Sequence, residues 1–93
     1  MTTTRFTYQQ LITLVEGDDE LITRLVDEGL IERTSGDLVL VDVDRVLVAR
    51  TLWRDLAIDW SSIELVLRLR EELAAARQQI VELEAALAAA RRR

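Results

Sequence analysis

The pattern of hydrophobic and polar positions predicts two short helices at the start of the chain. Residues 8–15 carry apolar side chains with helical spacing behind Thr7, a residue type that caps helices well. Gly17 provides a turn, and Asp18 or Asp19 can cap the second helix. The buried face of the second helix is predicted to consist of Leu21, Ile22, Leu25 and Val26.

A small β-hairpin is predicted next. Gly29 stands where a left-handed C-cap would end the second helix. Residues 34–37 are rich in turn formers, and residues 38–41 are apolar and β-branched, which predicts a hairpin with a short second strand. Helix, turn, helix and hairpin in this order predict a winged helix-turn-helix domain.

A third helix is predicted behind the hairpin. Asp42 or Asp44 can cap it, and it is expected to extend to about Leu56. Its inner face is predicted to consist of Val43, Val46, Leu47, Trp53 and Leu56. We interpret Trp53 as a core residue rather than a platform for a ligand, because large aromatic side chains commonly fill small cores.

The last third of the chain predicts one long helix. Ser61 and Glu64 have the spacing of a capping box, and no Gly or Pro follows them. Large apolar residues then repeat every seven positions, with Ala76 and Ala90 completing the stripe. The predicted dimerisation residues are Val66, Leu69, Leu73, Ile80, Leu83 and Leu87. This stripe favours a homodimeric coiled coil, parallel or antiparallel, over packing against its own domain. We therefore expect a winged-helix domain at 1–58 and a dimerisation helix at 59–93.

The residue inventory argues against an enzyme. The chain has 93 residues with no His and no Cys, which removes the commonest general base, thiolate chemistry and the usual zinc ligands. No glycine-rich phosphate loop and no metal-ligand spacing is present, so no cofactor and no metal are expected. No apolar run approaches the roughly 20 residues that span a bilayer, and the N-terminus lacks a signal-peptide core. We expect a cytoplasmic protein without membrane contact.

The charge of residues 16–32 conflicts with their predicted shape. This segment has the layout of a DNA-reading helix, yet it holds seven acids against Arg24, a formal charge of 1 − 7 = −6. DNA binding depends on cationic side chains that displace counterions from phosphates. The segment therefore favours a basic protein partner over DNA. The candidate partner-binding residues are Asp18, Asp19, Glu20, Asp27 and Glu28. Some of these acids could instead only stabilise a helix N-terminus or solvate the surface.

The segment Leu56–Leu73, LAIDWSSIELVLRLREEL, resembles the CbpM chaperone-modulator family, within the MerR-like architecture. Its most specific step is Asp59-Trp60 behind Leu-Ala, and Glu28-Gly29-Leu30-Ile31-Glu32 adds to the similarity. Ser61 stands where members of the family often have Pro. DNA-reading MerR proteins carry an Arg-Tyr-Tyr-Glu step in the second helix, and this chain has no aromatic residue there.

The resemblance implies a mainly α protein that is not an enzyme. Proteins of the CbpM family bind the J-domain of a co-chaperone of the CbpA/DnaJ type and inhibit it. An acidic surface could cover the basic J-domain helix that docks on Hsp70 and so compete with it. The alternative is a MerR-type DNA-binding transcriptional regulator, which the architecture and a two-fold dimer would suit.

Overall fold

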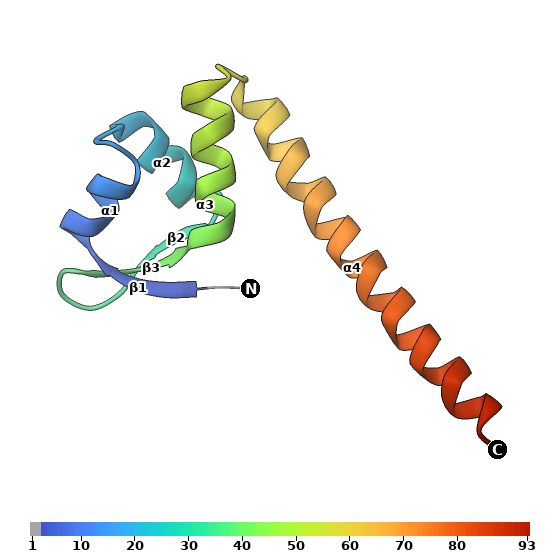
Figure 1. The fold of residues 1–93 in the computed structure, drawn as a ribbon. Coiled ribbons are helices and arrows are strands. Elements are labelled where there is room, and N and C mark those ends of the chain that lie inside the picture. Colours follow the sequence, from blue (N-terminus) through green and yellow to red (C-terminus); the bar gives the residue numbers. More distant parts are fainter. Residues whose placement is uncertain (1–2) are drawn as a thin grey trace. The chain divides into compact units, whose positions relative to one another are not determined.

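The computed structural model describes residues 3–93, and the chain is mainly helical with a small antiparallel sheet and a long C-terminal helix (Figure 1). The elements are β1 (Thr3–Thr7), α1 (Tyr8–Leu14), α2 (Asp19–Asp27), β2 (Ile31–Arg33), β3 (Leu38–Asp42), α3 (Val43–Arg50), the π-helical turn η1 (Thr51–Asp55) and α4 (Trp60–Arg91). Two compact units divide the chain. The first runs to Ile63 and includes the first turn of α4, and the second is Glu64–Arg93.

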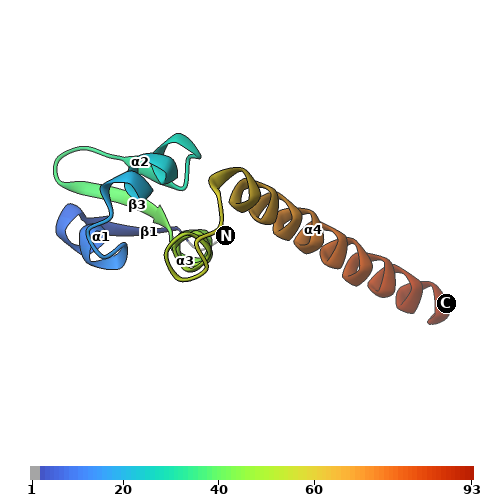
Figure 2. The ribbon, with the colours of Figure 1, turned by 90° about the horizontal axis from the view of Figure 1, so that it is seen from above.

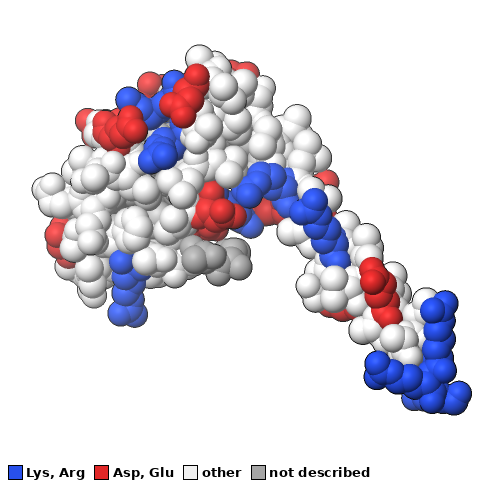
Figure 3. Space-filling model, in the orientation of Figure 1, with Lys and Arg blue, Asp and Glu red and all other residues white. Residues whose placement is uncertain are grey.

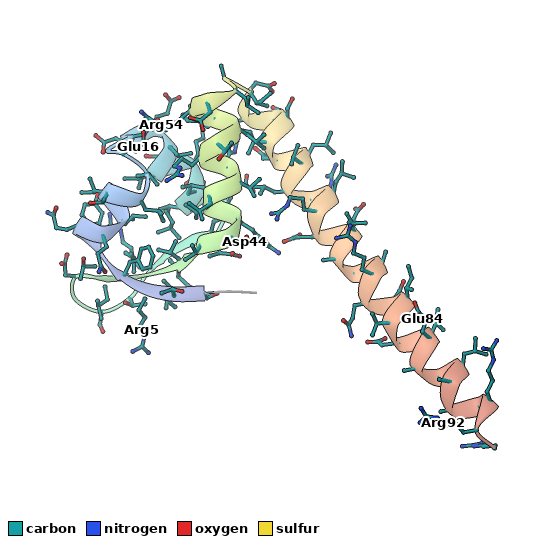
Figure 4. The ribbon with its side chains drawn as sticks, viewed as in Figure 1. Arg5, Glu16, Asp44, Arg54, Glu84 and Arg92 are labelled. Carbon is teal, nitrogen blue, oxygen red and sulfur yellow. The ribbon has the colours of Figure 1, made fainter. Side chains whose placement is uncertain are left out.

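The sheet has the order β1-β3-β2, and both pairs of neighbouring strands are antiparallel. The predicted hairpin is confirmed as β2 and β3, whereas β1 was not predicted. On β3, Val39 and Val41 are buried, and Phe6 and Thr4 pair with them from β1. The helices α1 and α2 lie over one face of this sheet (Figures 1 and 2), and Arg5 points away from them on the other (Figure 4).

The helix α1 begins at a capping box. The Thr7 hydroxyl accepts a hydrogen bond from the Gln10 amide at 3.1 Å, and the Gln10 side chain accepts one from the Thr7 amide at 2.8 Å. The turn after α1 differs from the prediction, because Glu16 and Gly17 both have positive φ, at 56° and 72°. Backbone bonds from Glu16 to Thr13 and from Gly17 to Ile12 form a Schellman ending with a glutamate in the left-handed position.

The helix α2 begins and ends as predicted. Asp18 is the N-cap, and Gly29, with φ of 77°, gives a Schellman ending in which the Leu30 amide donates to the Leu25 carbonyl at 2.9 Å. The side chains of Leu21, Ile22 and Leu25 are buried. The prediction for Val26 was wrong: this residue lies at the edge of the buried face and remains 39% exposed.

The third helical segment changes its geometry before it ends. Asp42 caps α3, and Val46 lies in the core as predicted. From Thr51 to Asp55 the helix is a π-helix, in which a backbone amide donates to the carbonyl five residues earlier. The Leu56 amide, for example, donates to the Thr51 carbonyl at 3.2 Å. This π turn alters the helical phase, so Trp53 is only half-buried and Leu56 is 59% exposed, contrary to the predicted inner face.

The core of the first unit is aliphatic and includes the start of α4. Its largest fully buried side chains are Leu11, Val15, Leu21, Leu25, Val41, Val46 and Ile63. Trp60 is buried as well. The predicted capping box of Ser61 and Glu64 was wrong, because Asp59 caps α4 instead: its carboxylate accepts hydrogen bonds from the Ser62 hydroxyl at 2.8 Å and the Ser62 amide at 3.2 Å.

Candidate protein-binding surface

The outer side of α2 carries carboxylates that have no partner within the described residues. The buried side chains of α2 lie on one side of the helix, and Asp19, Glu20 and Asp27 are exposed on the other, with Glu28 exposed at the C-cap. We call these four residues the acidic face. Across residues 3–93, none of them forms an ion pair or a side-chain hydrogen bond. Exposed Arg24 is their only basic neighbour on α2, so the formal charge is 1 − 4 = −3.

Asp18, the fifth predicted contact residue, has a structural role. One carboxylate oxygen accepts the Leu21 amide at 3.0 Å, and the other accepts the Trp53 indole N–H at 3.2 Å and the Arg54 guanidinium at 3.0 Å. The Leu21 backbone N–H, followed by the Arg54 and Trp53 donors, lowers the pKa of Asp18 below its ordinary value against the opposing effect of burial. This carboxylate therefore already accepts three hydrogen bonds from its own chain.

Arg54 neutralises one end of the acidic segment. Its guanidinium lies 3.2 Å from a carboxylate oxygen of Glu16 and 3.0 Å from one of Asp18, and Glu16 and Arg54 are seen together in Figure 4. Nearby, Arg50 donates to the Leu14 carbonyl at 2.8 Å. Figure 3 shows basic and acidic side chains in contact at this end of the unit, above a broad uncharged area. The formal charge of −6 for residues 16–32 thus overstates what a partner would meet.

Sequence reasoning missed Arg54 because it lies 36 residues from Asp18 along the chain. No local pattern signals a pair of this separation. The tryptophans complete the same contact region, since the rings of Trp53 and Trp60 meet edge to face with centroids 5.9 Å apart.

The Asp59-Trp60 step, which is the most specific part of the resemblance, has structural roles in this fold. Trp60 fills the core beside Trp53, and Asp59 caps α4. Hydrogen bonds from the Ser62 hydroxyl and then the Ser62 amide lower the pKa of Asp59. This step therefore builds the junction between η1 and α4.

The second unit is a single helix whose predicted dimerisation residues remain accessible. Val66 is half-buried, and the other five are about half exposed or more. Their exposed fractions are Leu69 52%, Leu73 50%, Ile80 54%, Leu83 70% and Leu87 52%. Alternating steps of three and four residues keep them on one stripe along α4, which is the geometry of a coiled-coil seam.

In residues 3–93, no group of three or more carboxylates could hold a metal ion. No helix in this range has the length and apolar character needed to cross a bilayer.

Comparisons with known proteins gave no match to any family model, curated protein or solved structure.

Proposed function

We propose that this chain is a non-enzymatic, homodimeric modulator that binds the J-domain of a CbpA/DnaJ-type co-chaperone and blocks its Hsp70-docking helix. The observation that carries the proposal is the acidic face of α2, whose four carboxylates have no partner among the described residues. Free carboxylates on one helix face attract a basic helix and favour correct encounter. The resemblance of Leu56–Leu73 to CbpM proteins supplies the J-domain as the basic partner.

The same charges disfavour the alternative of a MerR-type DNA-binding regulator. In a winged helix of that type, α2 would face the DNA. Arg24 is the only cation on α2, whereas protein–DNA complexes rely on several cationic contacts to phosphates. The pair formed by Arg54 with Glu16 and Asp18 removes another guanidinium from this role.

The seam of α4 supports the homodimer. From Val66 to Ala90 it would run about 36 Å along a partner helix, at roughly 1.5 Å per residue. An exposed apolar stripe of this length is rarely left in water on a soluble chain, so a second copy is the simplest cover for it. The charged residues Glu72, Arg77 and Glu84 flank the seam and can form interhelical pairs.

The proposal is tested by calorimetric titration of the full chain with a CbpA-type J-domain. In the test variant, Asp19→Asn, Glu20→Gln, Asp27→Asn and Glu28→Gln neutralise the acidic face without changing side-chain size. We expect affinity to fall about tenfold or more, because four exposed pairs contribute on the order of 0.2–1 kcal/mol each. Binding by the wild type should also weaken steeply with added salt.

A matched control removes the same number of charges elsewhere. It carries Asp37→Asn, Asp55→Asn, Glu64→Gln and Glu82→Gln, all at exposed positions that are not part of the acidic face. This control should bind within about twofold of wild type. Equal losses of affinity in both variants would show that the acidic face is not the binding surface. Absence of J-domain binding by the wild type would refute the proposed partner. Tight, sequence-specific DNA binding in a gel shift at low salt would establish the alternative instead.

A further inference from the structure

We propose that α4 pairs with α4 of a second copy of this chain in the opposite direction and at a single register. In this register, Leu73 of one copy faces Leu83 of the other. The inference rests on the homodimer of the proposed function and adds the direction and the alignment of its two helices. The helix α4 is uninterrupted from Trp60 to Arg91 (Figure 1), so a partner helix can follow it along the whole seam.

The spacing of the seam residues is compatible with both directions. These residues occupy two positions of a seven-residue repeat, separated by alternating steps of three and four residues. The first position holds Val66, Leu73, Ile80 and Leu87, and the second holds Leu69, Ala76, Leu83 and Ala90. In a parallel pair each residue faces the same residue of the second copy. Reversing one helix interchanges the steps of three and four, so the first position then faces the second. The two directions therefore combine different side chains in each layer.

The sizes of the seam side chains favour the antiparallel pair. In a parallel pair, Ala76 would meet Ala76 of the second copy between the layers formed by Leu73 and by Ile80. These two large layers would hold the helices too far apart for the two methyl groups to touch, which would leave a void in the seam. In the antiparallel pair, Ala76 faces Ile80. Likewise, Ala90 faces Val66, so each alanine has a larger, β-branched neighbour. The helices can then stay in contact along the whole seam.

Coverage of the apolar seam selects the register. When Leu73 faces Leu83, Leu69 faces Leu87 as well, and the seam is covered from Val66 to Ala90 in both copies. These four leucines are each at least half exposed in the single chain. This alignment therefore removes four large apolar side chains of each copy from water, which is the main source of stability in such a pair.

A shift by one seven-residue repeat covers less of the seam. If Leu83 faced Ile80, no apolar seam residue of the described chain would lie opposite Leu69. A shift in the other direction would place Leu87 opposite the polar side chain of Ser62. Burial of a leucine side chain stabilises a helix pair more than an exposed ion pair does. The lost coverage therefore decides against both shifted registers.

The charges at the end of α4 favour the same direction. The three residues Arg91–Arg93 follow the last seam residue. A parallel pair would gather the three arginines of both copies at one end of the coiled coil, where like charges repel over a Debye length of about 8 Å. An antiparallel pair places the two sets at opposite ends and brings together only the two Arg77 side chains, at its centre.

The flanking ion pairs do not decide the direction. A parallel pair would place Glu72 beside Arg77 of the second copy, and the antiparallel pair places Arg70 beside Glu84. Each direction thus forms one kind of favourable pair, twice over. The choice of direction therefore depends on the fit of the alanines and on the separation of the two arginine clusters.

The direction is tested by disulfide trapping in the full chain. The sequence has no cysteine, so an introduced thiol is the only one in its copy. The variants Leu73→Cys and Leu83→Cys, one of them isotope-labelled, are mixed and equilibrated in a glutathione buffer. Mass spectrometry then separates the mixed disulfide from the two disulfides between identical copies. We expect about tenfold more of the mixed disulfide, because only facing seam positions bring two thiols within bonding distance. An excess of the disulfides between identical copies would overturn the proposal.

The register is tested with the same assay. Leu83→Cys is mixed in turn with Ile80→Cys and with Val66→Cys, which would face it in the two shifted registers. Both mixtures should give less mixed disulfide than the mixture with Leu73→Cys. A higher yield from either of them would overturn the proposed register.

A second measurement needs no introduced thiol. The variant that replaces Arg91, Arg92 and Arg93 by Gln removes the basic end of α4. In an antiparallel pair, the dimer dissociation constant at low salt should stay within about twofold of the wild-type value in analytical ultracentrifugation. A dimer tightened about fivefold or more would show that the two clusters repel each other, as in a parallel pair, and would overturn the proposal.

The outcomes distinguish this inference from the proposed function. A dimer trapped mainly through identical positions leaves the proposed homodimer intact and refutes only its antiparallel direction. A chain that stays monomeric in ultracentrifugation refutes the homodimer and the helix pair together. If the mixed disulfide of positions 73 and 83 dominates but no J-domain binds, the antiparallel pair is supported and the proposed partner is refuted.

Discussion

Replacing Asp18 by alanine should be among the most destabilising surface substitutions in the first unit. The change removes three hydrogen bonds at once, to the Leu21 amide, the Trp53 indole and the Arg54 guanidinium. Loss of the N-cap costs about 1 kcal/mol. The indole N–H left without an acceptor costs about 1 kcal/mol, and the partly exposed pair with Arg54 contributes about 0.5 kcal/mol. Together these effects predict a loss of about 2–3 kcal/mol, as an upper figure because the bonds share one carboxylate.

The assay is thermal unfolding followed by circular dichroism and tryptophan fluorescence at a fixed protein concentration, since the proposed dimerisation would make the midpoint depend on concentration. A loss of about 2–3 kcal/mol corresponds to a fall in Tm of roughly 10–20 °C for a domain of this size. The fluorescence of Trp53 and Trp60, the only tryptophans, reports on the same contact region.

Asp19→Ala is the matched control, because Asp19 is the adjacent acid in α2 and has no side-chain partner in the described part of the chain. This substitution should lower the free energy of unfolding by only about 0.3–1 kcal/mol, because it removes only the interaction of the carboxylate with the helix dipole. Asp18→Asn keeps the N-cap and loses the charge, so its stability should lie between those of Asp18→Ala and Asp19→Ala. If Asp18→Ala and Asp19→Ala have the same stability, the bonds to Trp53 and Arg54 do not stabilise the fold.

The pH dependence gives a second check on Asp18. Its folded pKa is lowered, so the carboxylate contributes stability above its unfolded pKa and loses it as pH falls through the lower folded pKa. The stability difference between wild type and Asp18→Asn should therefore be constant near neutral pH. It should shrink as the pH drops from about 4 downward. A difference that persists unchanged at pH 2 would show that the charge of Asp18 is not its source.

Three other changes have clear expected outcomes. Gly29→Ala should cost about 1–2 kcal/mol in chemical unfolding, because φ is 77° while the space for a Cβ is open, and Gly29→Asn should lose less. Ile80→Glu should turn the proposed dimer into a monomer in analytical ultracentrifugation, whereas Val81→Glu, similarly exposed but off the seam, should remain dimeric. Dimers in both variants would rule out the seam. Asp59→Ala should lower the Tm and Ser61→Ala should not, since Asp59 caps α4. A lower Tm for Ser61→Ala alone would instead support the Ser61 cap predicted from the sequence.

Local signals in the sequence were enough to predict most helices of the first unit. Thr7, Asp18 and Gly29 act within a few residues of their own positions, so their cap roles can be read from spacing alone. Strand β1 could not be predicted in this way. Its stability comes from pairing with β3, as between Thr4 and Val41, and a short threonine-rich segment shows no alternation of its own.

The errors at Trp53 and Leu56 in the predicted buried face of the third helix have one physical cause. The predicted inner face assumes a constant helical step from Val43 through Leu56. The π turn from Thr51 to Asp55 breaks that step, so residues behind it no longer face the core as the pattern requires. The candidate site shows the same limit, because the pairing of Arg54 with Asp18 depends on the tertiary fold alone.

The two ends of the acidic face differ in what the fold itself explains. Asp19 and Glu20 lie in the first turn of α2, where negative charge is favoured by the helix dipole. Asp27 and Glu28 lie at the C-terminal end, where negative charge is unfavourable for the helix. The helix dipole therefore explains the presence of Asp19 and Glu20. It gives no stabilising role to Asp27 and Glu28.

A binding role for Asp27 and Glu28 predicts opposite effects on stability and on affinity. Neutralising this pair to Asn and Gln should stabilise the fold by about 0.3–1 kcal/mol for each charge removed, in thermal unfolding. The same variant should weaken J-domain binding more than the Asp19→Asn, Glu20→Gln variant, which should lose stability instead. Equal affinity losses from both pairs would show that the acidic face acts only through its total charge.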